Sequence, residues 1–183
     1  MRRRKDSLVA IDPGSQYLGY AAFEGKELVD FGVRTIRQGG PDTILEHVTE
    51  MLERMLTEKR PPVVVYEQNQ FSQATSNYRL LRVIGKIKSV SRVHRIRCIG
   101  YNARTIRRIV TGNGNARKID AARTIVSRFP ETKHYLRGRT RTQERYFGNM
   151  FDAVAAGVAH LETLGKQQPF QLSDLILRPK IGE

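Results

Sequence analysis

Four consecutive β-branched or aromatic residues, Val63-Val64-Val65-Tyr66, constrain this chain more than any other segment. They do not alternate with polar residues, which is typical of a strand buried on both faces of a sheet. Helices must then cover both faces of that sheet. The run is followed directly by Glu67, whose carboxylate is costly at a buried strand end unless it has a partner or a function. We therefore expect a sheet-centred fold with a chemical site at this strand end.

The segments on either side of this strand predict a mixed sheet with helices on both faces. Strand composition, turn signals and helical spacing of apolar residues alternate in the order three strands, helix, strand, helix, strand and then helices. Pro61-Pro62 ends the first helix. Besides the buried strand, the expected strands are 7–12, 17–23, 27–36 and 97–100, and the expected helices are 41–59, 74–93, 116–129 and 147–164.

The domain organisation is expected to be simple. The 183 residues suffice for one domain with a hydrophobic core, which we place at residues 7–165, between a basic tail at 1–6 and a polar tail at 166–183. No apolar run approaches the roughly 20 residues that span a membrane, and no signal-peptide core follows the basic N-terminus. We expect a cytoplasmic protein that is not secreted and does not bind membranes. Cys98 is the only cysteine, which excludes intrachain disulfides and cysteine-based metal sites.

The charge balance indicates a polyanionic partner. Lys and Arg number 32 against 18 Asp and Glu, giving a formal net charge of +14, and nucleic acid is the commonest partner of such a field. No acid occurs between Glu67 and Asp120. Within this stretch, the expected helix 74–93 carries a basic stripe of Arg79, Arg82 and Lys86, turned away from its apolar stripe. We interpret that stripe as a nucleic-acid face, and a solvated surface is the alternative.

Three carboxylates occupy special places in the predicted elements. Asp12 ends the first strand, Glu67 ends the buried strand, and Asp152 lies inside the last helix. Carboxylates at the ends of adjacent strands can converge, and hard oxygen ligands hold the pairs of divalent ions that promote phosphodiester hydrolysis. The alternatives are that Asp12 is an ordinary turn residue before Pro-Gly and that Asp152 is a surface position.

Four sequence blocks resemble one known family. In chain order they read IDPGSQYLGYAAFEG, VVVYEQNQF, YNARTIRRIVTGNGNARK and FDAVAAGVAHL. They resemble the motifs of the RuvC family of Holliday-junction resolvases, and they follow that family's order and spacing over most of residues 7–165. The resemblance implies an RNase H-like fold with a mixed five-stranded sheet flanked by helices on both faces.

The resemblance also implies roles for individual residues. Asp12, Glu67 and Asp152 carry over as catalytic ligands of two Mg²⁺ ions, which Mn²⁺ can replace. Arg107 and Lys118 fall where the family places basic residues near the scissile phosphate. Phe71 falls where an aromatic residue can act at the junction centre, with ordinary burial as the alternative. The full set expected to bind DNA is Phe71, Arg79, Arg82, Lys86, Arg104, Arg107, Arg108 and Lys118.

The function implied by the resemblance is resolution of four-way DNA junctions by paired symmetric nicks. The family also implies a homodimer, and a branch-migration or replication partner is possible, either at the nucleoid or in a virus-infected cell. Two alternatives stay open. One is another RNase H-like nuclease that acts on forks, flaps or RNA, and the other is a junction-binding protein without catalysis.

One departure from the family pattern motivates the second alternative. The family usually has Asp three residues before the last catalytic Asp, and here that position is Asn149. A neutral amide still offers an oxygen ligand but removes one negative charge from a site for two dications. Either the natural enzyme uses Asn149 as a catalytic ligand, or an Asp→Asn change has inactivated it, or another acid such as Glu144 takes its place.

Overall fold

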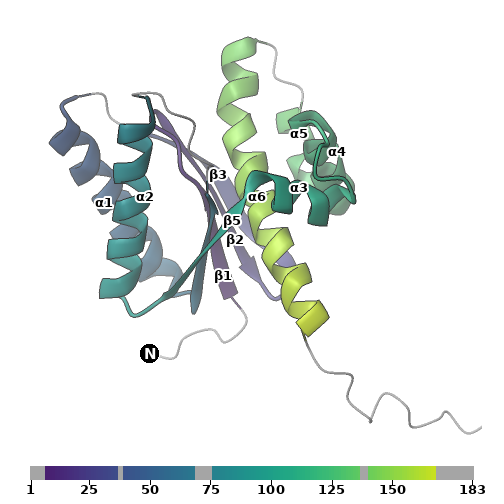
Figure 1. The fold of residues 1–183 in the computed structure, drawn as a ribbon, viewed down its shortest axis with the longest axis horizontal. Coiled ribbons are helices and arrows are strands. Elements are labelled where there is room, and N and C mark those ends of the chain that lie inside the picture. Colours follow the sequence, from purple (N-terminus) through teal and green to yellow (C-terminus); the bar gives the residue numbers. More distant parts are fainter. Residues whose placement is uncertain (1–6, 37–38, 69–75, 137–139, 168–183) are drawn as a thin grey trace, which may run out of the picture.

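A computed structural model describes residues 7–36, 39–68, 76–136 and 140–167 as a mixed five-stranded sheet between helices (Figure 1). The strand order is β3-β2-β1-β4-β5, in which β1 pairs antiparallel with β2 and parallel with β4. All six residues of β1 are buried, as are the first five of β4. The buried strand expected from its valine run is therefore confirmed. The strands are β1 Ser7–Asp12, β2 Tyr17–Glu24, β3 Glu27–Thr35, β4 Val63–Gln68 and β5 Arg97–Asn102.

The helices form two layers. Helices α1 and α2 cover one face of the sheet, and α6 crosses the other face with α3, α4 and α5 beside it (Figure 1). None of the helices in the described ranges has the length and apolar character needed to cross a membrane. The bounds are α1 Pro41–Lys59, α2 Ser76–Val93, α3 Ala103–Thr111, α4 Lys118–Arg128, α5 Lys133–Leu136 and α6 Arg141–Gln167, with a 3₁₀ turn at Pro130–Thr132.

The sequence-based prediction lacked helices α3 and α5, the 3₁₀ turn at Pro130–Thr132 and the start of α6. Helix α3 is only nine residues long, too short for periodicity to identify it, although Ile106, Ile109 and Val110 have helical spacing. Its caps are nevertheless regular, because the Asn102 side chain accepts a hydrogen bond from Thr105 N at 2.8 Å and Gly112 has a φ of 81°. Helix α6 begins at Arg141, six residues before the expected start. The apolar pattern did not reveal these residues because the first turns of the helix are polar.

The predicted tails are only partly testable. Helix α6 continues to Gln167, so the expected boundary at residue 166 falls inside its last turn. Residues 1–6 and 168–183 lie outside the described part of the chain.

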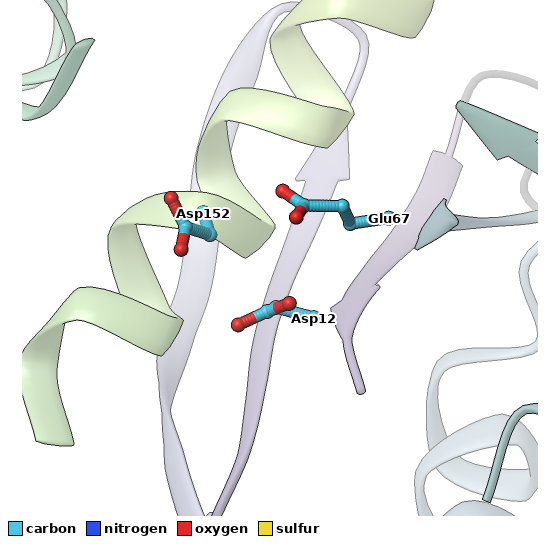
Figure 2. Close-up of side chains that lie close together, drawn as sticks. All are labelled: Asp12, Glu67 and Asp152. Atoms are coloured by element: carbon cyan, nitrogen blue, oxygen red, sulfur yellow. The ribbon is translucent and has the colours of Figure 1, made fainter. Parts of the chain in front are cut away.

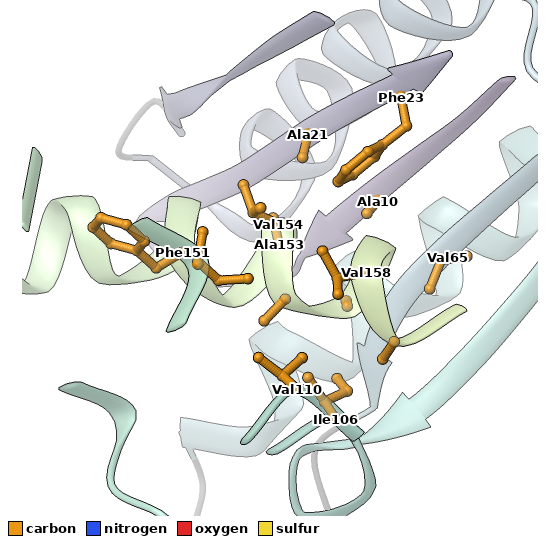
Figure 3. Packing of buried hydrophobic residues seen from close by; sticks show 14 of the residues in the cluster. Ala10, Ala21, Phe23, Val65, Ile106, Val110, Phe151, Ala153, Val154 and Val158 are labelled. Carbon is orange, nitrogen blue, oxygen red and sulfur yellow. The ribbon is translucent and has the colours of Figure 1, made fainter. Parts of the chain in front are cut away.

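Each face of the sheet has its own hydrophobic core. The core between the sheet and α6 contains Phe23, Ile106, Val110 and a nearly continuous run of small residues from Ala153 to Ala159 (Figure 3). The core on the opposite face is formed with α1 and α2 around Leu52 and other large aliphatic residues. Because the run on α6 is rich in alanine, this helix lies close to the strands that it crosses.

Two glycines mark the closest approach of α6 to β2. A Cβ atom on Gly19 would lie 2.0 Å from the backbone oxygen of Asn149, and one on Gly157 would lie 2.3 Å from the Phe23 ring. Gly19 pairs with Asp12 in the β1–β2 register. Helix α6 therefore rests on the sheet beside the end of β1, and only glycine at position 19 permits this.

We predict that Gly19→Ala lowers the free energy of unfolding by about 1–3 kcal/mol, because the new methyl group meets backbone atoms that cannot rotate away. Thermal unfolding followed by circular dichroism measures this. Gly165→Ala is the matched control, since an added Cβ there meets no atom within 4 Å. Equal stability of the two variants would contradict the close approach.

Candidate metal centre and nucleic-acid interface

The topology brings three carboxylates together at one edge of the sheet (Figure 2). Strands β1 and β4 are parallel neighbours, with Ile11 opposite Tyr66, so Asp12 and Glu67 leave the sheet side by side. Asp152 reaches the same point from α6, one turn beyond the close approach at Asn149. Oxygen atoms of the three carboxylates lie within 4.8 Å of one another. We call these three residues the carboxylate cluster.

Two members of the carboxylate cluster are buried, and the negative charges of the three carboxylates repel one another. Asp12 and Glu67 are each only 6% exposed. Burial raises the pKa of Asp12 well above its usual range, and the charges of Asp152 and Glu67 raise it further. Burial and then the charge of Asp152 raise the pKa of Glu67 to about 7. Three oxygen ligands held together at this cost are the donor set that hard divalent cations prefer.

Lys118 and Arg107 lie beside the carboxylate cluster but act differently. Lys118 begins α4, and its ammonium group forms an ion pair with Asp152. Arg107 on α3 is half-buried; its Nε donates to Ala103 O and its Nη1 donates to Ala116 O, both at 3.2 Å. Arg107 thus ties α3 to the segment that leads into α4, while its positive charge lowers the pKa of Glu67.

Asn149 lies one helical turn before Asp152 and is half-buried. It lines the same pocket as Asp152 and Lys118, beside the carboxylate cluster. Glu144 lines that pocket too, but it is exposed, and its carboxylate is not among those that converge in the described residues. Asn149 and Glu144 were the two candidates for a fourth ligand, and only Asn149 lies one turn from Asp152 on α6.

The basic stripe on α2 is less unbalanced than the sequence suggested. No acid lies on α2, but Arg82 forms an ion pair with Asp42 of α1 at 3.1 Å. Arg82 and Lys86 also line a groove whose other wall carries acidic residues of α1, including Glu46. Arg79 is exposed. The stripe is therefore balanced in part by acids of α1, although α2 itself carries none.

The remaining residues expected to contact DNA lie in two places. Arg104 and Arg108 are exposed on α3, the same helix that carries Arg107. Phe71 lies outside the described residues.

Comparison with known proteins identifies the family. The family model of the crossover junction endodeoxyribonuclease RuvC matches residues 8–135. The chain belongs to the RuvC family. It is thus an enzyme of a family of hydrolases that cut DNA, which confirms the resemblance seen in its motifs. A search of curated proteins finds no match to the sequence.

Solved structures confirm the RNase H-like resolvase fold. RuvC of Thermus thermophilus has a TM-score of 0.69 at 19% identity, covering 87% of this chain and 96% of that chain. The T. thermophilus RuvC complex with Holliday junction substrate gives 0.68 at 18% identity, covering 84% and 92%. The yeast mitochondrial Holliday junction resolvase Ydc2 gives 0.69 at 8% identity, covering 91% and 81%.

We predict that the metal-free protein loses stability as the pH rises from about 4.5 to about 7. The pKa of Glu67 is 4.5 in the unfolded chain and about 7 in the folded one, so the folded state binds this proton more tightly and its ionisation opposes folding. The raised pKa of Asp12 acts in the same direction.

Melting temperatures measured against pH in a chelator test this prediction. Glu67→Gln should flatten the dependence and melt higher than the unmodified protein at pH 8. Glu50→Gln, which removes an exposed carboxylate of α1, is the control and should leave the dependence unchanged. A melting temperature that rises over this interval would contradict the burial of the carboxylate cluster.

Proposed function

We propose that this protein is a structure-selective endonuclease that resolves four-way DNA junctions by paired nicks. The observation that carries the proposal is the carboxylate cluster at the edge of a RuvC-family fold. Two proteins with this fold act on or bind four-way junctions. T. thermophilus RuvC was solved in complex with Holliday junction substrate, and Ydc2 is a Holliday junction resolvase. The acid-free stretch from Gln68 to Ile119 supplies the positive charge that such a substrate requires.

We propose Asp12, Glu67, Asp152 and Asn149 as the ligands of two Mg²⁺ ions, which Mn²⁺ can replace. The donor set fits, because it offers three carboxylates and one amide oxygen in a site where the carboxylates repel one another. Bound divalent ions would stabilise charge on the attacking and leaving oxygens during hydrolysis. Asn149 makes the site one charge less negative than four carboxylates would, so ion affinity should be lower.

The basic residues of the site have separate proposed roles. The side chain of Lys118 is 71% exposed, so it can turn from Asp152 towards a phosphate with little loss of packing. Arg107 holds the segment before α4 and thereby positions Lys118. Exposed Arg79, Arg104 and Arg108 contact the backbone of the junction arms, and Arg82 and Lys86 contribute less because α1 acids face them.

Asp12→Asn or Glu67→Gln should abolish junction cleavage and leave junction affinity within a few-fold, because chemistry needs the ions whereas affinity comes from phosphate contacts. The assay is cleavage of a mobile four-way junction in Mg²⁺, with gel-shift binding measured in parallel. Asn149→Asp should lower the Mg²⁺ concentration needed for half-maximal cleavage. Normal cleavage by Asp12→Asn would exclude this site.

The same assay separates the two alternative functions. Cleavage of flaps or RNA in preference to junctions would favour another RNase H-like nuclease. No cleavage by either the unmodified chain or Asn149→Asp would favour a protein that only binds junctions.

We further propose that the enzyme is a homodimer and that α2 is its interface. Five residues spaced by three or four positions share the face of α2 opposite the core, and all are exposed. Tyr78 is 63% and Leu81 is 41% exposed, and a Cβ on Gly85 would meet no atom within 4 Å, which leaves room for close contact with another helix. A two-fold dimer matches a two-fold junction. The five residues are Tyr78, Leu81, Gly85, Ser89 and Arg92.

Leu81→Glu should weaken the dimer at least tenfold, because it places a charge beside Tyr78 in the apolar part of this face. Sedimentation velocity measures the change. In a supercoiled plasmid with an extruded cruciform, the variant should give nicked circles where the unmodified enzyme gives linear DNA. Val29→Glu, at an exposed apolar position of β3, is the control. A Leu81→Glu protein that sediments like the control would exclude α2 as the interface.

A further inference from the structure

A pocket of about 530 Å³ opens beside the carboxylate cluster, between α4, α5 and the first half of α6. Its volume lies within the range of roughly 300–1,000 Å³ that is usual for small-ligand sites. Asp152, Asn149 and Lys118 line one end, so the pocket and the carboxylate cluster share a boundary. The other residues that line the pocket take no part in the proposed metal site.

The walls of this pocket are aromatic and aliphatic. Tyr135 and Phe147 have ring centroids 5.1 Å apart, and Phe31 holds Tyr135 edge-to-face from β3 at 5.8 Å. Tyr135 remains 37% exposed despite these contacts. Flat apolar walls with one exposed aromatic ring suit a planar aromatic ligand. The other apolar lining residues are Ile119, Ala122, Leu136 and Phe151.

Gly148 is the least expected residue of this lining. It lies in the interior of α6, where glycine is unfavourable relative to alanine. At Gly19 and Gly157 a side chain would collide with neighbouring atoms, but a Cβ on Gly148 would meet nothing within 4 Å. Packing within the protein therefore does not require a glycine here. Because Gly148 lines the pocket, its missing side chain leaves this space open to a ligand.

We propose that this pocket receives a nucleobase from the cleaved strand, next to the scissile phosphate. The inference rests on the proposed nuclease function. A phosphate bound at the carboxylate cluster lies at the mouth of the pocket, because Asp152 belongs to both. The neighbouring nucleotide of the same strand is then the nearest planar apolar group. A base unstacked at the open centre of a junction can enter without breaking a paired duplex.

The charge around the mouth favours DNA over an aromatic side chain of a protein partner. Lys118 and the exposed Arg145 line the pocket, opposed by Glu144. A nucleotide brings its own phosphate to these cations, which a neutral aromatic side chain does not. Insertion of the base would hold the strand in register over the carboxylates and make cleavage depend on the sequence beside the nick.

An abasic scan tests the proposal with the unmodified protein. Single abasic sites are placed in turn at the six nucleotides nearest the nick, and single-turnover cleavage rates are compared with those of the intact junction. Base stacking on aromatic side chains leads us to expect a loss of about tenfold or more at one position adjacent to the scissile phosphate and little loss elsewhere. A uniform response at all positions would overturn the proposal, whereas absence of cleavage of the intact junction would overturn the proposed function instead.

Substitutions at Gly148 give the second test. Gly148→Leu fills the pocket and leaves the three carboxylates unchanged. It should slow cleavage of the intact junction to the rate measured for the junction with the most harmful abasic site. The abasic site should then have no further effect, since both changes remove the same contact. Gly165→Leu, another glycine of α6 with open space before it, is the matched control.

Binding of a fluorescent base separates occupancy from catalysis. In the Asp12→Asn background, 2-aminopurine at the critical position should be quenched on binding, and Gly148→Leu should abolish the quenching while affinity stays within about threefold. Quenching that persists in Gly148→Leu, or normal cleavage by a folded Gly148→Leu protein, would overturn the base assignment. The second result would leave a protein partner as the occupant.

Discussion

The close approach of α6 to β2 is the contact on which the site depends. Asp12 and Glu67 come together through the sheet alone, because they end neighbouring parallel strands. Asp152 comes from the helical layer, and its distance from the sheet depends on how closely α6 packs against β2. Gly19 removes the obstacle at the point where the backbone of Asn149 lies, one turn from Asp152. A missing side chain on β2 thus brings the third carboxylate to the other two.

This convergence lowers the stability of the folded protein when the carboxylates are ionised. Burial and mutual repulsion raise the pKa values of Asp12 and Glu67, so the folded protein disfavours their charged forms. The structure offsets part of this cost with its own cations, since Lys118 pairs with Asp152 and the charge of Arg107 acts on Glu67. In the proposed function, the same two side chains would also place positive charge beside a bound phosphate.

The sequence predicted the sheet and the carboxylates better than it predicted their surroundings. The valine run and its terminal Glu67 give strong local signals, and the four family motifs placed Asp12 and Asp152 in the same site. Helix α3 was missed because it has only nine residues, although Asn102 and Gly112 marked its ends. The balance of Arg82 by Asp42 was invisible, because it joins residues 40 positions apart on two helices. Charge counted along one helix does not measure the potential at its surface.

Glycine shows why the pocket also escaped the sequence. In the sequence, Gly19, Gly148 and Gly157 are alike, and each reads only as a weak point in a strand or helix. The structure separates them: Gly19 and Gly157 are required by atoms of the protein itself, whereas Gly148 faces a void that protein atoms leave unfilled. A helix that tolerates an unfavourable residue beside an open, aromatic-walled space next to three carboxylates retains room for something other than itself. On the proposed function, that group is the base next to the scissile phosphate of the substrate.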